Sequence, residues 1–344
     1  MIRAIGLTKV YGRAARDAAA LLKRGASGAE AAQRTGATVA VDDVSFDVAR
    51  GELFVVMGLS GSGKSTLVRM LNRLVEPTAG ELTIDGADVL AMDDAALREL
   101  RNRRVSMVFQ HFALLPHRTV LENAAYGLRI RGVEQPTATR RAASALEQVG
   151  LGAWGGALPS ELSGGMKQRV GLARALATDA DIMLMDEPFS ALDPLIRREM
   201  QALVADLRRA LGKTIIFITH DLNEAMRLGD RILILRDGRM VQLATRAELL
   251  SSPADAYVED FVSDVDRLRV LTAADAARPL PDGFASEATA VVDAGRPLAE
   301  VVGLVRAGDG PVAVVDGGGR LIGTISEGSL LDTVVARAPE AVRA

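Results

Sequence analysis

Cysteine is absent from this chain of 344 residues, and histidine is almost absent. Without cysteine the chain has no disulfide, no thiolate nucleophile and no cysteine-ligated metal site. The absence fits a reducing compartment and is equally compatible with an oxidising one. No run of about 18 apolar residues occurs, so the sequence offers no candidate for a membrane-spanning helix. We therefore expect a soluble protein without thiol chemistry.

A large excess of one charge is also lacking. The formal net charge is −3, which gives no bulk electrostatic attraction for nucleic acid. The segment after Met1 lacks the basic-then-apolar layout of a secretory signal. We expect a cytoplasmic chain that serves a membrane, if it serves one, by docking on another protein. At about 100 to 200 residues per domain, the length predicts about two domains.

What the sequence does contain is a regular alternation of strand-like and helix-like segments. Short apolar runs, typical of strands buried in a parallel sheet, occupy residues 52–57, 105–109, 182–185, 215–219 and 232–235. Helical stretches lie between them at residues 66–74, 138–149, 167–177 and 196–211. This alternation predicts a parallel α/β core.

The first 50 residues follow a different pattern. A short strand is expected over residues 2–7, and alternating apolar and polar residues predict a half-buried strand over residues 39–48. Between them, residues 13–34 are rich in Ala, Leu and Arg and are interrupted at Gly25 and Ser27. This segment predicts two short helices or one helical hairpin.

A glycine-rich loop follows the strand at residues 52–57 and leads into a helix. Its sequence satisfies the pattern G-x-x-x-x-G-K-S. Glycines allow successive backbone N–H groups to point into one concavity and wrap phosphates. Lys64 would bring positive charge to the β- and γ-phosphates, and Ser65 would supply a hydroxyl ligand for Mg²⁺. The predicted binding residues are Gly58, Ser60, Gly61, Ser62, Gly63, Lys64, Ser65 and Thr66.

Two adjacent carboxylates end the strand at residues 182–185. Strand alternation places the side chains of Asp186 and Glu187 on opposite sides of the chain. Asp186 can then ligate the metal while Glu187 faces an attacking water. Acidic residues at strand ends are also common as solvated turn groups, but the phosphate loop earlier in the chain favours catalysis.

A serine and two glycines open the helix expected at residues 167–177. Alone, this Leu-Ser-Gly-Gly segment would be a helix N-cap with exposed backbone donors. In the order of the chain, six elements together resemble the nucleotide-binding domain of an ATP-binding cassette (ABC) transporter over residues 1–260. They are the phosphate loop, Gln110 after a strand, the LSGG-x-x-Q segment, the Asp-Glu strand, Ser190-Ala-Leu-Asp193, and His220 after a strand.

The resemblance implies that two copies close head to tail, so that ATP on the loop of one copy is capped by the other. The capping contacts would come from Ser163, Gly164 and Gly165. Gln110 would ligate Mg²⁺ and reach the attacking water, and His220 would contact the γ-phosphate. Asp193 would connect the two sites.

Three further side chains take their interpretation from the resemblance. Tyr11 is placed like the aromatic residue that stacks on adenine, although residues 13–38 separate it far from Val41, and an ordinary edge-strand tyrosine is the alternative. His111 and His117 flank a region that in ABC proteins receives a helix of the transmembrane subunit. We expect surface or interface roles for these two histidines.

Longer stretches of sequence resemble one group within this family. Residues 56–66, 71–77, 107–116 and 189–197 are similar to the ATPase of glycine betaine/proline (quaternary amine) importers. Pro188 departs from the alanine frequent in that group, though proline there is usual across ABC proteins. The cofactors implied are ATP and Mg²⁺. The partners implied are a second copy, a transmembrane permease and, indirectly, a substrate-binding protein, with no nucleic acid, at the cytoplasmic face of the inner membrane.

Two alternatives stay open. One is an importer of the same architecture for another solute, such as methionine or a polyamine, because specificity resides in the permease and the binding protein. The other is a soluble ABC ATPase acting on ribosomes or DNA. Such proteins usually carry two cassettes or long coiled-coil arms, and this sequence shows neither.

The fold class expected is therefore an α/β P-loop NTPase with a parallel-sheet core, an antiparallel β subdomain and a helical subdomain. We place this nucleotide-binding domain at residues 1–264, with a helical insertion at about 13–38 and the helical subdomain at about 111–180. The boundary is set at a change of composition, because the remaining residues contain no lysine and no comparable motif.

Residues 265–344 carry eleven acidic and eight arginine side chains. Within them, residues 310–331 resemble part of a CBS motif, a small regulatory module, with two strand-like runs around the glycine-rich turn at 316–319 and a following helix. A degenerate second half would have to come from residues 267–290. A small α+β CBS-like regulatory region is expected, with a packing or dimerising appendage as the alternative.

Overall fold

The structure is a computed structural model of the whole chain, and it describes residues 1–110, 113–190, 192–279, 290–308 and 310–335. It divides into two compact units, Met1–Val241 and Gln242–Ala344. His111 and part of the expected second CBS half, residues 280–289, lie outside the described residues. Among the residues that the structure describes, no helix has the length and apolar character needed to cross a bilayer.

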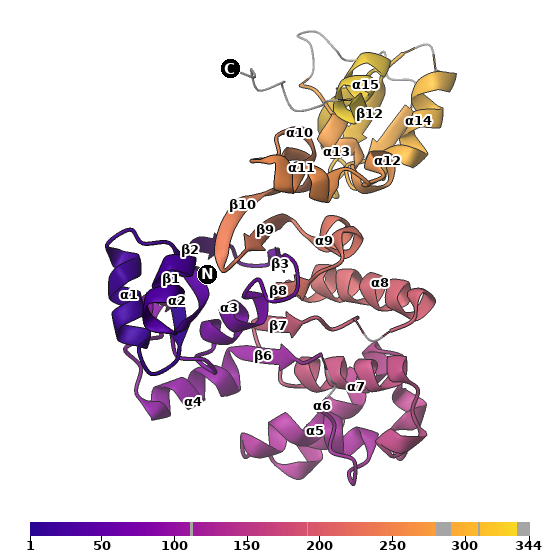
Figure 1. Cartoon of the computed structure of the whole chain (residues 1–344). Helices are drawn as coiled ribbons and strands as arrows, with labels where there is room; N and C mark the ends of the chain where they lie inside the picture. Colours follow the sequence, from indigo (N-terminus) through magenta and orange to yellow (C-terminus); the bar gives the residue numbers. More distant parts are fainter. Residues whose placement is uncertain (111–112, 191, 280–289, 309, 336–344) are drawn as a thin grey trace. The chain divides into compact units, whose positions relative to one another are not determined.

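A six-stranded sheet forms the centre of the first unit (Figure 1). Its strand order is β10 (Arg239–Thr245), β9 (Arg231–Arg236), β3 (Leu53–Met57), β8 (Thr214–Thr219), β7 (Ile182–Asp186) and β6 (Val105–Val108). The four pairings from β9 to β6 are parallel. Every residue of β3, β7 and β8 is buried, as expected for parallel strands covered on both faces. The predicted parallel α/β core is confirmed.

The register of this sheet brings three strand ends together. Met57 of β3 pairs with Thr219 of β8, and Asp186 of β7 pairs with Ile218 of β8. The segments that follow these strands therefore leave the sheet at the same edge. In open parallel sheets the crevice beyond the carboxyl ends of the strands is where ligands bind.

A helix follows each of these strand ends after a short segment of chain. They are α3 (Lys64–Leu71), α8 (Pro194–Leu211) and α9 (Leu222–Leu228). The side chain of Asp193 accepts hydrogen bonds from two backbone N–H groups of α8, and Asp221 does the same for α9. Because each cap satisfies N–H groups without an intrahelical partner, it fixes where its helix starts. α3 starts at Lys64, two residues before the predicted start. The turn into the helix is made at Gly63, whose φ is +97°.

A four-stranded antiparallel sheet lies beside the central sheet. Its order is β2 (Thr38–Val48), β1 (Ile2–Tyr11), β4 (Ala79–Ile84) and β5 (Ala87–Asp88), and α4 (Asp94–Arg103) follows it. β1 is longer than predicted because its pairing with β2 continues across irregular register to Tyr11 and Thr38.

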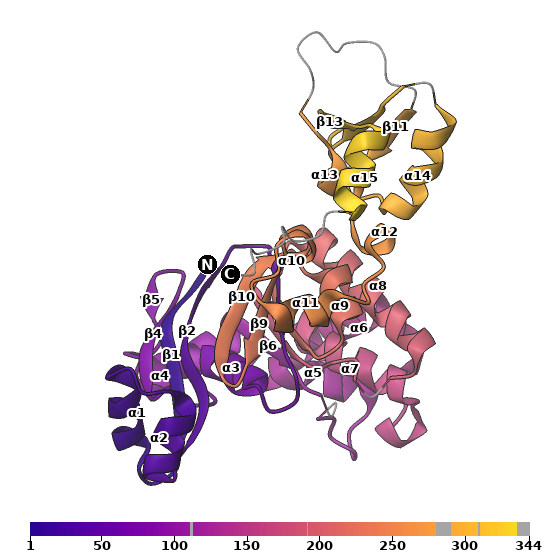
Figure 2. The ribbon, with the colours of Figure 1, turned by 45° about the horizontal axis from the view of Figure 1, so that its top comes forward.

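Two helices, α1 (Ala15–Lys23) and α2 (Gly28–Thr35), connect β1 to β2 and lie beside them in both ribbon views (Figure 2). Their small core consists of Val10, Ala18, Ala31 and Ala37. Alanine at these positions allows the two short helices to pack closely on the end of β1.

A helical part of the first unit contains α5 (Val120–Ile130), α6 (Gln135–Gln148) and α7 (Gly164–Ala177), with two single 3₁₀ turns, η1 (Gly152–Trp154) and η2 (Pro159–Glu161), before α7. The three long helices pack against one another. Thr119 and Glu122 form a capping box at the start of α5. Ser163 caps α7, and its hydroxyl accepts from the N–H of Met166.

The second unit contains its own three-stranded sheet, in the order β11 (Ala290–Asp293), β12 (Val312–Val315) and β13 (Leu321–Ile325). β11 pairs parallel with β12, and β12 pairs antiparallel with β13. The described helices of the unit are α10 (Arg246–Ser251), α11 (Ala256–Val262), α12 (Arg267–Val270), α13 (Ala273–Ala276), α14 (Leu298–Ala307) and α15 (Glu327–Val335). The two strands and the helix predicted here are confirmed. The compact units divide after Val241, whereas the sequence composition changes near residue 265.

Candidate functional site

The loop after β3 lines a hollow of about 350 Å³ at the edge of the sheet where the strand ends meet. The hollow is mostly polar, and side chains from other elements complete it. Its lining consists of Ala40, Ser60, Gly61, Gly63, Lys64, Ser65, Thr66, Gln110 and Glu187. The structure therefore brings most of the predicted phosphate loop together with Gln110 and Glu187.

The backbone of this loop fits only glycine at two positions. A Cβ atom at Gly63 would lie 2.2 Å from the carbonyl oxygen of Ala40, and one at Gly58 would lie 2.2 Å from that of Leu235. Both residues also have positive φ, which side chains disfavour. The hydroxyl of Ser62 is buried next to them without a hydrogen-bond partner in the described chain. A loop with a free backbone concavity and an unsatisfied buried hydroxyl fits an anionic ligand such as a phosphate.

Lys64 is held at the base of the loop. Its side chain is only 5% exposed, and the ammonium donates to the carbonyl oxygens of Gly58 (2.8 Å) and Leu59 (2.9 Å). Burial lowers the pKa of Lys64, and the charges of Glu187 and Asp186 partly offset this effect. A buried lysine that faces two carboxylates and a polar hollow is placed to bind a further anion.

Asp186 joins β7 to α3 through both of its carboxylate oxygens. Ser65 Oγ donates to Oδ1 at 2.8 Å, and Arg69 Nη2 lies 3.0 Å from Oδ2. A hydroxyl and a carboxylate oxygen form the donor set that Mg²⁺ takes when phosphates and water supply its remaining ligands. Within the described parts of the chain, no group of three or more His, Asp or Glu side chains could hold a metal by itself. Ser65 and Asp186 fit a Mg²⁺ ion shared with a nucleotide.

Glu187 is the meeting point of the remaining predicted residues. His220 Nδ1 lies 3.2 Å from Glu187 Oε2, Gln110 Nε2 lies 3.5 Å from the same oxygen, and Lys64 Nζ lies 3.9 Å from Oε1. The side chain is 18% exposed, so water can reach it.

The backbone of Glu187 is strained. Its φ is +44°, which costs a residue with a side chain about 1–3 kcal/mol. Proline follows it and further restricts its conformation, while its N–H donates to the carbonyl oxygen of Ile218. Such strain persists where the surroundings enforce it, and it gathers at functional sites. The geometry thus marks Glu187 as a candidate base.

Nine predicted residues do not line the hollow. Gly58, Asp186 and His220 bond to residues that do, and Ser62 lies within the loop. The other five are Tyr11, Ser163, Gly164, Gly165 and Asp193. Ser163 and Gly164 are exposed at the start of α7. Gly165 is buried, and a Cβ there would lie 2.4 Å from Cγ2 of Ile196 on α8. Within one copy, the close approach of α7 to α8 already explains glycine at this position.

Tyr11 lies at the end of β1, and its side chain is 41% exposed. The ammonium of Lys9 lies 4.9 Å from the centre of its ring, within cation–π range. Its strand partner, Thr38, is two residues before Ala40, which lines the hollow. The end of β1 therefore lies beside the part of β2 that leads to the hollow, and the ring of Tyr11 is in contact with a cation.

Three residues of the site were not predicted as functional residues from the sequence. Arg69 follows Ser65 by four residues on α3, so both side chains reach Asp186 from one helix face. Ser190 accepts from Gln110 Nε2 (3.3 Å) and donates to the carbonyl oxygen of Glu187 (3.1 Å). Ala40 of β2 is the third, as part of the lining of the hollow. The helical spacing could have indicated Arg69, while the other two depend on tertiary placement.

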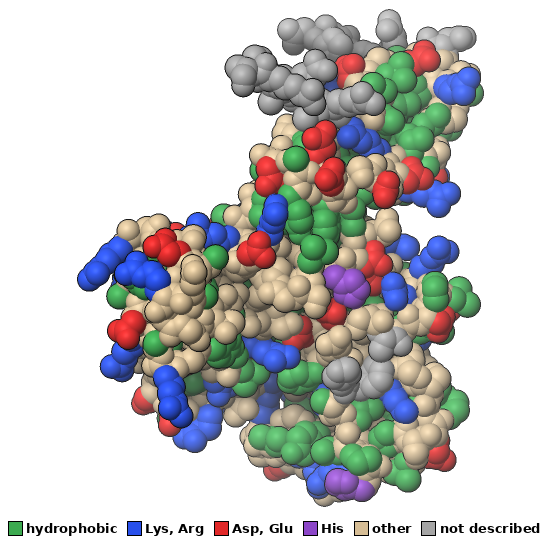
Figure 3. Space-filling model, in the orientation of Figure 1, with side chains coloured by type: hydrophobic (Ala, Val, Ile, Leu, Met, Phe, Trp, Pro, Cys, Tyr) green, Lys and Arg blue, Asp and Glu red, His purple; other side chains and the backbone are tan. Residues whose placement is uncertain are grey.

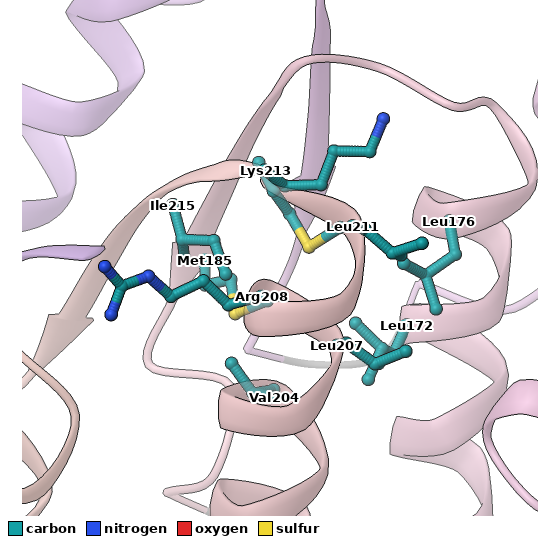
Figure 4. Close-up of a pocket in the computed structure, with 10 residues that line it drawn as sticks. Leu172, Leu176, Met185, Val204, Leu207, Arg208, Leu211, Lys213 and Ile215 are labelled. Atoms are coloured by element: carbon teal, nitrogen blue, oxygen red, sulfur yellow. The ribbon is translucent and has the colours of Figure 1, made fainter. Parts of the chain in front are cut away.

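Another hollow has a different character. It lies between α7, α8 and the strands β7 and β8, has a volume of about 10 Å³, and is lined mainly by aliphatic side chains such as Leu172, Leu207 and Ile215 (Figure 4). The charged ends of Arg208 and Lys213 point out of it and pair with Asp230 and Asp179. An apolar gap of that size holds no ligand. On the face drawn in Figure 3, acidic and basic side chains are interspersed over the first unit.

A loop of this shape, leading from a buried parallel strand into a helix that begins at its lysine, is that of the P-loop nucleoside triphosphate-binding domains. The family model described as ABC transporter matches residues 41–190, which span the loop and the Asp-Glu strand. The sequence is 55% identical over 267 residues to the glycine betaine transport ATP-binding protein OpuAA of Bacillus subtilis. That match covers 78% of this chain and 64% of the relative, so the chain spans just under two thirds of that protein.

A second relative matches over more of the chain. The trimethylamine N-oxide transport system ATP-binding protein TmoW of Pelagibacter ubique is 44% identical over 305 residues, 89% of each protein. The solved dimeric, ADP- and phosphate-bound ATP-binding cassette MJ0796 superposes with a TM-score of 0.60 at 33% identity, covering 72% of this chain and 99% of that one. The chain belongs to the ATP-binding proteins of the ABC transporter family.

Proposed function

We propose that the chain is the ATP-hydrolysing subunit of an ABC importer for a quaternary amine osmolyte of the glycine betaine type. The observation that carries the hydrolytic activity is the position of Glu187, whose carboxylate faces the phosphate hollow between Gln110, His220 and Lys64. The importer and its solute class rest on the relatives, among them the glycine betaine transport protein at 55% identity.

In this proposal the loop binds the nucleotide's phosphates. The loop N–H groups and Lys64 hold the β- and γ-phosphates, and the N-terminus of α3 adds its positive end. Ser65, Asp186 and Gln110 hold Mg²⁺, which when bound neutralises charge on the phosphate oxygens. Glu187 orients the attacking water and accepts its proton as the water oxygen bonds to the γ-phosphorus and the bond to ADP breaks. His220, which contacts Glu187 now, donates a hydrogen bond to the γ-phosphate when ATP is bound.

A second copy completes the site. Ser163, Gly164 and Gly165 lie at the N-terminus of a 14-residue helix, where free N–H groups and the helix dipole favour a phosphate. Since these residues do not line the hollow of their own copy, we assign them to the γ-phosphate of the partner copy, with Asp193 at the contact between the sites. The exposed face of Tyr11 stacks on adenine. The dimeric state of the MJ0796 cassette supports this arrangement.

The remaining partners follow from the importer. A transmembrane permease docks on the chain and a substrate-binding protein delivers the solute to that permease, so the chain acts as a peripheral subunit at the cytoplasmic face of the inner membrane. We assign residues 1–264 to the nucleotide-binding domain and residues 265–344 to a CBS-like regulatory or dimerising region. The α/β make-up of the second unit supports that assignment.

A second solute is favoured by one observation. The TmoW match covers 89% of both chains, whereas the OpuAA match covers 78% of this one. Trimethylamine N-oxide and glycine betaine share a methylated, positively charged nitrogen and a negative oxygen. The alternative is therefore an importer of the same architecture for trimethylamine N-oxide.

One reconstitution distinguishes the two. The chain is purified with its permease and binding protein in lipid vesicles, and ATP hydrolysis is measured with glycine betaine, proline, choline, carnitine or trimethylamine N-oxide. We expect glycine betaine to stimulate hydrolysis most. Stimulation by trimethylamine N-oxide alone supports the alternative solute, and hydrolysis that responds to none of the five contradicts both.

A further inference from the structure

Glu187 and His220 also border a second polar cluster, and the proposed mechanism uses none of its other members. It surrounds a hollow of about 10 Å³, enough for about one water molecule. The lining residues are Glu187, Ser190, Arg197, Thr219, His220, Asp221 and Glu224. Glu224 is 4% exposed and Thr219 is 2% exposed, so these two members belong to the protein interior, while His220 reaches the surface.

Thr219 and Glu224 fix the backbone on both sides of His220. The Thr219 hydroxyl donates to Glu224 Oε2 at 2.6 Å and accepts from the N–H of Asp221 at 2.9 Å. Gln201, on α8, donates to the other oxygen of Glu224 at 3.2 Å. Because Thr219 and Asp221 flank His220 directly, these bonds determine the direction in which the imidazole leaves the chain.

Arg197 connects this segment to another one. Its Nη1 lies 3.2 Å from Asp221 Oδ2, and its Nη2 donates to the carbonyl oxygen of Leu192 at 3.2 Å. Its Nε lies 3.8 Å from Glu224 Oε1. Leu192 directly precedes Asp193, and Ser190, at the other end of the same segment, bonds to the backbone of Glu187. One guanidinium thus joins the segment after Glu187 to the segment that carries His220.

This arrangement is costly in stability. Burial raises the pKa of Glu224, opposed in part by its hydrogen bonds and by Arg197. Apolar side chains of similar size usually stabilise a core as well as a buried ion pair does, or better. A buried carboxylate beside a half-buried guanidinium, placed between two site segments, therefore points to a requirement for geometry at this place.

We propose that Arg197 and Glu224 are positioning residues for ATP hydrolysis, which hold His220 against Glu187 by tying its segment to the one that ends at Asp193. The proposal rests on the proposed function, because it assigns them to that reaction. Neither side chain lines the phosphate hollow.

The first measurement needs no hydrolysis. The chain has only three histidines, so the ring signals of His220 and His117 can be assigned in NMR spectra of the nucleotide-free full chain by single substitutions. We expect Arg197→Ala and Glu224→Gln to shift or broaden the His220 signal and to leave that of His117 unchanged. Arg198→Ala, an exposed arginine one residue along α8, should change neither. An unchanged His220 signal in both variants overturns the proposal.

The second measurement is a double-mutant cycle on ATP turnover by the full chain. Arg197→Ala should lower kcat about 10- to 100-fold with little change in KM, since a small misplacement of a site group has effects of that order. In a His220→Ala background the same change should cause almost no further loss. Equal losses in both backgrounds show a general structural role and overturn the proposal. If the wild-type chain does not hydrolyse ATP while the NMR result holds, the proposed function fails and the positioning of His220 by this pair stands.

Discussion

The two units of the chain differ in which polar side chains they bury. The first buries charged side chains, among them Lys64 at 5%, Asp186 at 2% and Glu224 at 4% exposure. Every described non-glycine residue with a positive φ, Glu187 included, also lies in the first unit. In the described part of the second unit the buried polar side chains are Thr272, Thr324 and Ser329, none of them charged.

This difference indicates where chemistry is possible. A buried charge or a strained backbone costs a few kcal/mol and persists only where a large surrounding core enforces it. The first unit has such a core in its six-stranded sheet. The second has a three-stranded sheet, and none of its described charged side chains is fully buried. A regulatory or dimerising role, which would use the surface of the second unit, is compatible with this difference.

The largest effect we expect comes from removing one charge in the first unit. Glu187→Gln keeps the shape of the side chain and removes the base, so ATP turnover should fall about 10²- to 10⁴-fold while ATP still binds. Turnover and binding of a fluorescent ATP analogue measure the two effects. The matched change in the second unit, Glu300→Gln, alters an exposed pair with Arg296 and should leave turnover unchanged. Turnover close to wild type in Glu187→Gln contradicts the assignment.

A smaller effect is expected from a methyl group on the phosphate loop. In Gly63→Ala the new Cβ would meet the carbonyl oxygen of Ala40 at 2.2 Å, so the loop must shift and ATP binding should be lost, with about 1–3 kcal/mol of stability. Gly319→Ala in the second unit has a similar φ, +77°, but open space around the Cβ. It should cost only about 1–2 kcal/mol of backbone strain and leave ATP binding intact.

Nucleotide titrations and thermal unfolding of both glycine variants test this pair. Gly61→Ala is a third variant for comparison. Gly61 lies in the same loop as Gly63 and has φ +82°, but a Cβ there would have no neighbour within 4 Å. We expect its ATP binding to lie between the other two. Equal ATP affinity of Gly63→Ala and Gly61→Ala would show that the close contact of Gly63 with Ala40 of β2 does not determine the conformation of the loop.

Much of the first unit could be predicted because its signals are local. Apolar runs predict buried strands, and the glycine loop predicts the strand–turn–helix in which Lys64 lies. His220 and Gln110 could be placed near Glu187 only through the resemblance, since nothing local joins residues that far apart in sequence. The geometry then shows why they meet: parallel strands end at one edge.

The residues that could not be predicted depend on tertiary contacts. Ser190 becomes part of the site only when the segment after β7 lies beside Gln110, which follows β6. Glycine at position 165 is explained within one copy by Ile196 on another helix, which no local pattern shows. The left-handed backbone of Glu187 is equally invisible, because residues with a carboxylate and a following proline seldom adopt it.

The smallest effect on turnover should follow a core change in the second unit. Leu298 of α14 is fully buried, and Leu298→Ala should destabilise this unit by about 2–5 kcal/mol. We expect amide hydrogen exchange in β11, β12 and β13 to accelerate while ATP turnover by the full chain stays at the wild-type rate. The matched variant in the first unit, Leu67→Ala on α3, also empties a fully buried site, next to the phosphate loop. It should raise exchange in β3 and lower turnover together. If turnover falls in Leu298→Ala as well, the second unit supports the ATPase site directly, and the separation of chemistry from surface function is wrong.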